Sequence, residues 1–176
     1  MMGYLKKKRV YLTGSISDAK DAGIGWRKII TPRLKQFGLI VDDPTKKTAS
    51  NNRGEVGKDK EYFAKLIKQR KFEKVKDAFW PIVRQDLRSV DLADFIIWHW
   101  NPEERLLGTI HELVIGHAIE KKPVLLHVDD HLVEKINPWG LVFVKKGCLF
   151  TDWSKMYKYL EDINKGKFNT SYWTLG

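Results

Sequence analysis

Glu112 is the residue of this sequence best placed to do chemistry. It closes the segment Gly108-Thr109-Ile110-His111-Glu112, which follows a strand-like apolar run at 95–98 and opens a helix-like segment. A carboxylate in the first turn of a helix, at the carboxyl end of a strand, lies where open α/β sheets bind ligands. Such a carboxylate can act as a nucleophile on a sugar. Thr109 and Glu112 also have the spacing of a capping box, in which Glu112 only stabilises the helix start.

Two further segments converge on Glu112 if the sheet is parallel, because the carboxyl ends of parallel strands share one edge. The loop Gly14-Ser15-Ile16-Ser17 follows the first strand and offers backbone N–H groups and hydroxyls to a phosphate or a sugar. Asp86 supplies a second carboxylate, and a carboxylate pair is the minimum for glycosyl chemistry through a covalent intermediate. Tyr11 could hold the nucleophile by a hydrogen bond. Taken singly, the loop is an ordinary turn and Asp86 a surface carboxylate.

Metal and cofactor chemistry is not predicted. His111 and Glu112 begin like a zinc-protease helix, but the next histidine, His117, follows after six residues and points to another face. The other histidines also lack ligand spacing. There is no P-loop and no serine in a nucleophile elbow.

The composition favours one soluble globular domain. The chain has 176 residues, of which 43% are hydrophobic and 31% charged, and this excludes disordered and collagen-like classes. No apolar run approaches the length of a membrane span, and the amino-terminal residues do not form a signal peptide. Cys148 is the single cysteine and cannot form an internal disulfide, which favours a cytoplasmic location.

The charge favours anionic partners. The formal net charge is +10, and residues 53–76 contain nine Lys or Arg against four acidic residues. Nucleotides, phosphorylated metabolites and nucleic acid are the classes that such an excess attracts. The alternative is a solvated basic face that aids solubility.

The chemistry-bearing residues need a scaffold of alternating strands and helices. The hydrophobic pattern predicts strands at 9–13, 39–41, 95–98, 123–128 and 141–144. It predicts helices at 24–37, 59–77, 78–90, 108–121 and 152–164, with a loop at 45–58, a short segment at 130–137 and an aromatic tail at 168–173. Pro32 should kink or divide its helix.

This alternation predicts an α/β fold with a doubly wound, mainly parallel five-stranded sheet of the flavodoxin or Rossmann-like type, covered by helices on both faces. Residues 1–176 are expected to form a single domain. Residues 45–77 form a basic loop-helix insertion within it.

The ordered set of motifs resembles the nucleoside 2-deoxyribosyltransferase superfamily, which includes the 2′-deoxynucleoside 5′-monophosphate N-glycosidases. The resemblance covers about residues 9–128. The motifs that carry it are Val10-Tyr11-Leu12-Thr13-Gly14-Ser15-Ile16, Trp26-Arg27, Val41-Asp42-Asp43-Pro44, Gln85-Asp86-Leu87, Ala93-Asp94, Gly108-Thr109-x-x-Glu112, Ala118 and Lys122-Pro123-Val124.

The resemblance implies a role for each matching residue. Glu112 would be the nucleophile at the anomeric carbon, Asp86 would assist proton transfer or orient the sugar, and Tyr11 would hydrogen-bond Glu112. It also implies a homo-oligomer, a dimer or larger, with shared active sites. Asn137, in Ile136-Asn137-Pro138-Trp139-Gly140, would reach into the site of a neighbouring subunit.

One position departs from the family. Two residues before Gly108, transferases usually carry Asp and the nucleotide hydrolases Ser, but this chain has Leu106. An apolar side chain cannot bind a hydroxyl or a phosphate, so Glu104 or Arg105 would have to substitute. An arginine suits a phosphate because it binds bidentately.

The sequence therefore predicts an enzyme that cleaves the N-glycosidic bond of a deoxynucleoside or deoxynucleotide and passes the sugar to another base or to water. The alternatives are a nucleotide hydrolase and a non-catalytic nucleotide- or nucleic-acid-binding module. Trp26, Trp98 and Trp100 are candidates to stack on the base, although aromatic residues beside a strand more often belong to the core. The residues expected to bind substrate are Gly14, Ser15, Ile16, Ser17, Trp26, Arg105, Gly108, Thr109 and Asn137.

Overall fold

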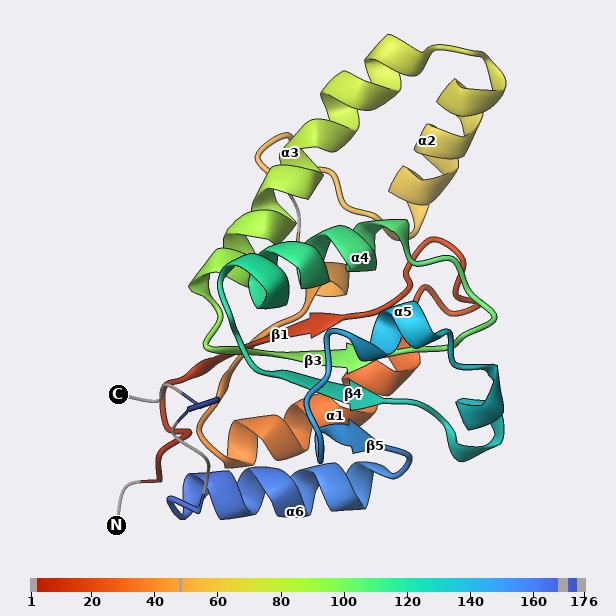
Figure 1. The fold of residues 1–176 in the computed structure, drawn as a ribbon. Coiled ribbons are helices and arrows are strands. Elements are labelled where there is room, and N and C mark those ends of the chain that lie inside the picture. Colours follow the sequence, from red (N-terminus) through yellow and green to blue (C-terminus); the bar gives the residue numbers. More distant parts are fainter. Residues whose placement is uncertain (1–2, 48, 168–170, 174–176) are drawn as a thin grey trace.

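Five parallel strands form the centre of the protein (Figure 1). The computed structural model describes residues 3–47, 49–167 and 171–173. The sheet order is β2-β1-β3-β4-β5, and every neighbouring pair is parallel. The strands are β1 (Arg9–Thr13), β2 (Ile40–Asp42), β3 (Phe95–His99), β4 (Val124–His127) and β5 (Leu149–Phe150). This confirms the predicted doubly wound α/β fold, whose strand order is that of flavodoxin-like proteins.

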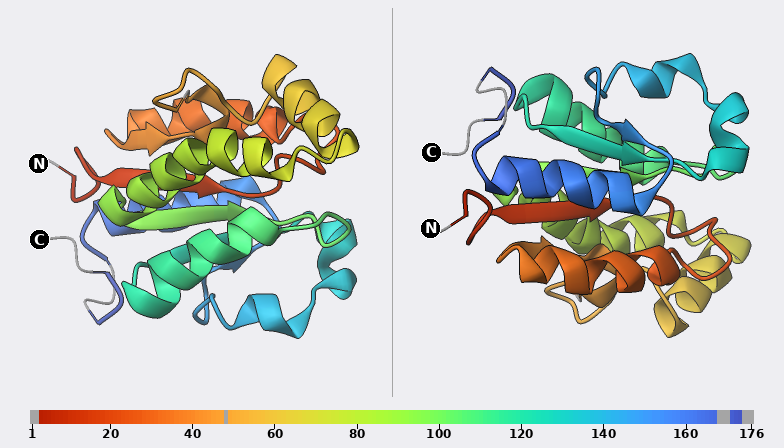
Figure 2. Two further views of the ribbon diagram at one scale, coloured as in Figure 1. Left: turned by 90° about the horizontal axis from the view of Figure 1, so that it is seen from above. Right: turned by 90° about the horizontal axis from the view of Figure 1, so that it is seen from below.

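Helices cover both faces of the sheet (Figure 2). On one face, α1 (Ile24–Gln36) and α6 (Trp153–Asn164) pack over Val10, Leu12 and Phe95. On the other face lie α3 (Phe72–Leu92), α4 (Leu107–Leu113) and α5 (Pro138–Leu141). Successive strand residues point to opposite faces, so Tyr11, Ile96 and Trp98 belong to this second core.

The order of the strands creates a crevice beside β1. The chain runs from β1 outward to β2 and then crosses back to β3 on the other side of β1. At such a switch point the loops after the strands separate, and open α/β sheets bind their ligands there. The loop after β1 and the segment between β3 and α4 therefore border the expected site.

The insertion between β2 and β3 forms a helical hairpin that projects from the body (Figure 1). A short 3-10 turn, η1 (Pro44–Lys46), is followed by irregular chain, then by α2 (Lys58–Lys68) and α3. The predicted division at 77/78 is wrong, because the chain turns at Gln69–Lys71. Arg70 has a left-handed φ of 55° there, and Lys71 N donates to Leu66 O, which closes α2.

The predicted fifth strand at 141–144 is also wrong. Asn137 caps Trp139 N with its side chain, and Pro138 occupies the first turn, so the chain starts the short helix α5 instead. The apolar residues that suggested a strand cover the sheet: Phe143 lies in the core formed with Trp98 and Trp100. The true edge strand, β5, is only two residues long.

The remaining elements agree with the predictions within a few residues. The helix α1 continues through Pro32 without being divided. The predicted helix at 108–121 is α4 followed by a π-helical turn, η2 (Val114–Ile119), and 130–137 contains a 3-10 helix, η3 (Asp130–Lys135). Of the predicted aromatic tail, residues 168–170 lie outside the described residues, while Tyr172 and Trp173 are buried in the core. Within the described ranges, no helix combines the length and apolar character needed to cross a membrane.

Candidate active site

A cavity of about 730 Å³ lies at the carboxyl edge of the sheet, beside β1. Its wall is formed by the loop after β1, by one face of α3 and by the start of α4. The structure brings most of the predicted site residues together here. Those that line the cavity are Gly14, Ser15, Ile16, Ser17, Asp86, Arg105, Gly108, Thr109 and Glu112.

Glu112 is held by two hydroxyl groups of β1. Tyr11 Oη donates to Glu112 Oε1 at 2.7 Å, and Thr13 Oγ1 donates to Glu112 Oε2. The capping-box alternative is wrong, because α4 begins at Leu107 and its N-cap residue, Leu106, makes no side-chain cap bond. The Glu112 carboxylate therefore lines the cavity and bonds to β1, and it does not cap the helix.

Burial and hydrogen bonding act in opposite directions on Glu112. The pKa of this carboxyl is raised above its ordinary value, because burial outweighs the bonds from Thr13 and Tyr11 and the charge of Arg27, which lower it. Tyr11 is completely buried, and this burial with the neighbouring Glu112 charge raises its pKa well above 10.0. Tyr11 thus keeps its proton at neutral pH and donates a hydrogen bond to the carboxylate.

Asp86 reaches the cavity from α3 and is 7% exposed. The pKa of Asp86 is raised to about 8. Burial is the largest cause, and the charges of Glu112 and Glu55 raise the pKa further, whereas the charge of Lys47 lowers it by a smaller amount. Asp86 therefore carries a proton at neutral pH. The site holds an oriented carboxylate and a protonated carboxyl, the pair of states that acid-assisted displacement requires.

Glu55 is a third cavity carboxyl, and sequence reasoning missed it. It follows Gly54 in the irregular chain before α2, and no local pattern distinguishes it from the other three acidic residues at 53–76. Burial, followed by the Glu112 charge, raises the pKa of Glu55 to about 7, while Arg27 and a hydrogen bond with Asp86 lower it. Only the folded insertion brings this residue to the cavity.

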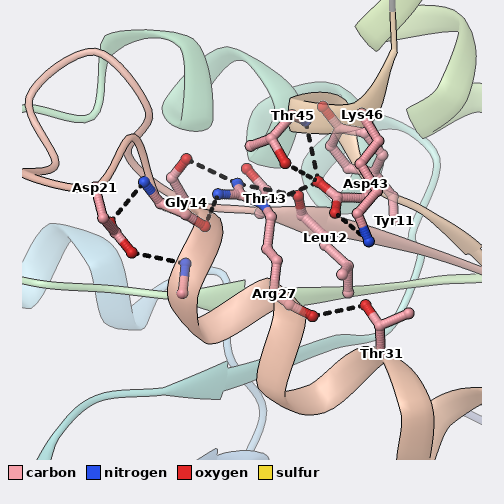
Figure 3. Close-up of polar contacts among 12 residues, drawn as sticks. Tyr11, Leu12, Thr13, Gly14, Asp21, Arg27, Thr31, Asp43, Thr45 and Lys46 are labelled. Carbon is pink, nitrogen blue, oxygen red and sulfur yellow. Dashed lines mark hydrogen bonds and ion pairs between the residues drawn. The ribbon is translucent and has the colours of Figure 1, made fainter. Parts of the chain in front are cut away.

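Arg27 secures the loop after β1 from below (Figure 3). This fully buried guanidinium donates from Nη1 to Gly23 O at 2.8 Å and from Nη2 to the carbonyls of Gly14 and Leu12. Its Nε lies 3.7 Å from Asp43 Oδ1, at the end of β2. Arginine suits this place because its rigid fork serves several acceptors at once.

Gly14 allows the loop to pass close to β3. A Cβ at this position would lie 2.6 Å from the backbone oxygen of His99, which is too close for any side chain. Ser15 and Ile16 are buried behind the turn, whereas Ser17 is exposed and its carbonyl accepts from Lys60 Nζ at 2.7 Å. This bond ties the loop to the insertion.

The mouth combines one cation with apolar side chains. The Arg105 side chain is 92% exposed and pairs with Asp18 Oδ2 at 3.1 Å. Leu106 lines the cavity, as do the aromatic residues Phe79 and Trp80 of α3. Trp80 is 55% exposed although it is a large aromatic residue, and sequence reasoning did not single it out.

Four predicted residues lie elsewhere in this chain. Trp26 does not line the cavity and stacks on Trp153 at 6.0 Å beneath the loop. Trp98 and Trp100 are buried and stack on each other at 4.7 Å. Asn137 is exposed and caps α5.

No group of three or more His, Cys, Asp or Glu side chains in the described ranges could hold a metal ion. Neither the protein-family models nor the curated proteins give a match to this chain. The chemistry of the cavity is therefore the basis for a functional proposal.

Proposed function

We propose that this protein is an N-glycosidase or N-deoxyribosyltransferase that cleaves the bond between the base and the sugar of a deoxynucleoside or deoxynucleotide. The observation that carries the proposal is the carboxylate of Glu112, held on both oxygens by Tyr11 and Thr13 and facing the cavity that it shares with Asp86. Glycosyl transfer with a covalent intermediate requires such a nucleophile and a second carboxyl that supplies a proton. The motifs shared with the deoxyribosyltransferase superfamily are consistent with this chemistry.

The first half-reaction forms an ester. A Glu112 oxygen bonds to the anomeric carbon while the bond to the base nitrogen breaks, and its electron pair remains on the base. Asp86 delivers the proton that neutralises the departing base. Tyr11 and Thr13 orient the attacking carboxylate so that little reorganisation is needed at the transition state.

The second half-reaction breaks that ester. Water, or a nitrogen of a second base, bonds to the anomeric carbon as Glu112 leaves as a carboxylate. The attacking group loses a proton, and the Asp86 carboxylate accepts it, which restores the starting state. The protein is a hydrolase if water is the attacking group, and a transferase if a second base is the attacking group.

The cavity suits a nucleoside or its monophosphate in size and in character. Pockets for small ligands range from about 300 to 1,000 Å³, and this one falls within that range at about 730 Å³. Phe79 and Trp80 offer aromatic surface for a base, and Arg105 is the exposed cation available to a phosphate. Leu106 contributes only apolar surface.

The test is a product assay with matched variants. The protein is incubated with each deoxynucleoside and each monophosphate, with and without a second free base, and products are separated by chromatography. Release or exchange of base, lost in Glu112→Gln and kept in Glu61→Gln, is the expected result. Glu61 is an exposed carboxylate on α2 and serves as the control.

Nucleic-acid binding is the second candidate, favoured by the nine basic residues at 53–76 on the projecting hairpin. If no substrate gives a product and the protein binds DNA or RNA in a salt-sensitive way, the protein is a binding module and not an enzyme. The expected homo-oligomer, with Asn137 acting in a neighbouring site, stays a prediction. Analytical ultracentrifugation would test it.

A further inference from the structure

The cavity contains more acid than its cations can balance. Glu55, Asp86 and Glu112 all line it. The two nearby buried or half-buried cations are already committed to other carboxylates, Arg27 to Asp43 and Lys47 to Asp42 at 3.0 Å. Three ionised carboxyls lining one cavity would repel one another, which favours at least one proton remaining among them.

Glu55 is held in place from outside the cavity. Ala49 N donates to Arg53 O at 2.7 Å, and Arg53 in turn bonds to Asp59 Oδ1 at 3.0 Å. The other oxygen of Asp59 accepts from Gly54 N at 2.9 Å, directly before Glu55. The Arg53 guanidinium also lies 3.7 Å over the ring of Tyr62 on α2. The insertion thus presents Glu55 to the cavity on an anchored segment.

The partner of Glu55 is Asp86. Both side chains line the same cavity, Glu55 from the insertion and Asp86 from α3. The pKa values of the two carboxyls are coupled through a side-chain hydrogen bond, which two ionised carboxylates could not form. The other charged groups that face them are Glu112 from α4, Lys47 from the chain after η1, and Arg27 from α1. The shared hydrogen bond therefore marks where the remaining proton resides.

We propose that Glu55 is a positioning residue that shares the catalytic proton with Asp86, holds it there before the base departs and draws a proton back to Asp86 in the second half-reaction. The inference rests on the proposed glycosyl-transfer function. It gives the insertion a function, because that segment brings Glu55 to the cavity. It also separates the three carboxyls by role: Glu112 bonds to carbon, Asp86 transfers the proton, and Glu55 keeps Asp86 protonated in the free site and restores its proton after transfer.

The changing charge of Glu112 explains why a third carboxyl is needed. In the free site, burial and then the Glu112 charge keep the proton on Asp86. Formation of the ester removes that charge, which makes Asp86 a stronger acid as the base departs. In the ester, Glu55 is the neighbouring negative charge that remains. It draws the proton of the attacking water or base back onto Asp86.

The first test is the pH dependence of kcat/KM in Glu55→Gln. Loss of the Glu55 charge should let Asp86 ionise more easily, so the alkaline limb should move to lower pH by about one unit. Glu55→Asp keeps the charge and should retain a profile closer to that of the native protein. Glu61→Gln is the control. A native alkaline limb in Glu55→Gln would overturn the proposal.

The second test does not depend on activity. The side-chain carboxyls are labelled with ¹³C, and their titration is followed by NMR in the folded native protein, in Asp86→Asn and in Glu55→Gln. A carboxyl with a midpoint near 8 should vanish in Asp86→Asn and move to lower pH in Glu55→Gln. An unchanged midpoint in Glu55→Gln refutes the shared proton. The shift without any turnover supports the pair and rejects the glycosyl-transfer function.

Discussion

Tyr11 Oη donates to Glu112 Oε1 at 2.7 Å, from an interior strand to the helix on the next layer. Thr13 lies two residues further along β1 and donates to the other oxygen of the same carboxylate. Residues i and i+2 of a strand point to the same face, so the strand geometry alone aligns the two donors. The nucleophile proposed for this site is therefore oriented by a buried sheet and not by a loop.

Removal of the Tyr11 hydroxyl should raise the pKa of Glu112 and lower the rate. The Tyr11 hydrogen bond lowers the pKa of Glu112, so Tyr11→Phe should raise that pKa and move the acid limb of kcat/KM to higher pH. A hydrogen bond to a charged group contributes about 1.5–3 kcal/mol, so the rate should fall about tenfold or more. Tyr157→Phe on α6 is the control. A native rate and acid limb in Tyr11→Phe would remove Tyr11 from the mechanism.

Asp86→Asn should abolish proton delivery without unfolding the protein. The amide matches the shape of the carboxyl but has no transferable acidic proton, so a fall in kcat of about a hundredfold or more is expected. In the native protein, activity should decline as the pH rises through about 8, because the acid form of Asp86 is then lost. Steady-state kinetics and far-UV circular dichroism measure the two effects. Full activity would show that another group supplies the proton.

The same substitution should stabilise the protein at alkaline pH. The pKa of Asp86 rises from an ordinary value of 3.8 to about 8 on folding, so between these values the folded state binds more protons than the unfolded state. The free energy of unfolding therefore falls as the pH rises through that window. Asp86→Asn has no carboxyl to ionise and therefore does not lose this stability. Its Tm should exceed the native Tm by a few degrees at pH 9 and match it near pH 4. Calorimetry at the two pH values is the measurement, and a lower Tm at pH 9 would contradict it.

Arg27 should contribute to the stability of the whole carboxyl edge. Arg27→Met would leave Asp43 buried without its partner and free the carbonyls of Gly14 and Gly23. Breaking a buried ion pair costs about 3–5 kcal/mol, and urea unfolding should show a loss of this order. Arg33→Met changes an exposed arginine of the same helix and should have a small effect. Equal losses in the two variants would show that the Arg27 bonds add no stability.

Gly116 allows the π-helical turn after α4 to pack on the sheet. A Cβ there would lie 2.4 Å from Ile96 Cδ1 and 3.0 Å from Val90 Cγ1, both in the core. Gly116→Ala should therefore destabilise the protein by about 1–3 kcal/mol, measured by urea unfolding. Gly108→Ala meets no atom within 4 Å and tests the cost of the methyl group alone. A Gly116→Ala variant as stable as Gly108→Ala would mean that the turn shifts at no cost.

The hydrophobic pattern identified the buried strands of the sheet, but it could not tell a strand from a segment that covers the sheet. The buried runs that became β1, β3 and β4 are continuous and apolar, so their type follows from local composition. The apolar residues at 141–144 have the same local character, but the Asn137-Pro138 start turns them into a helix and a covering segment. The Asn137 cap and the packing of Phe143 on the sheet together decide between these outcomes.

By itself, the sequence determined the parallel sheet and the edge at which Tyr11, Asp86 and Glu112 meet, because parallel strands end on one side. Tertiary structure decided how those groups are held there. The choice between a helix cap and an oriented carboxylate depended on whether Glu112 bonded its own helix or β1. The place of Glu55 depended on how the insertion folds back, and its proton depends on burial among like charges. Burial and charge coupling arise between residues distant in the sequence, so no local pattern encodes them.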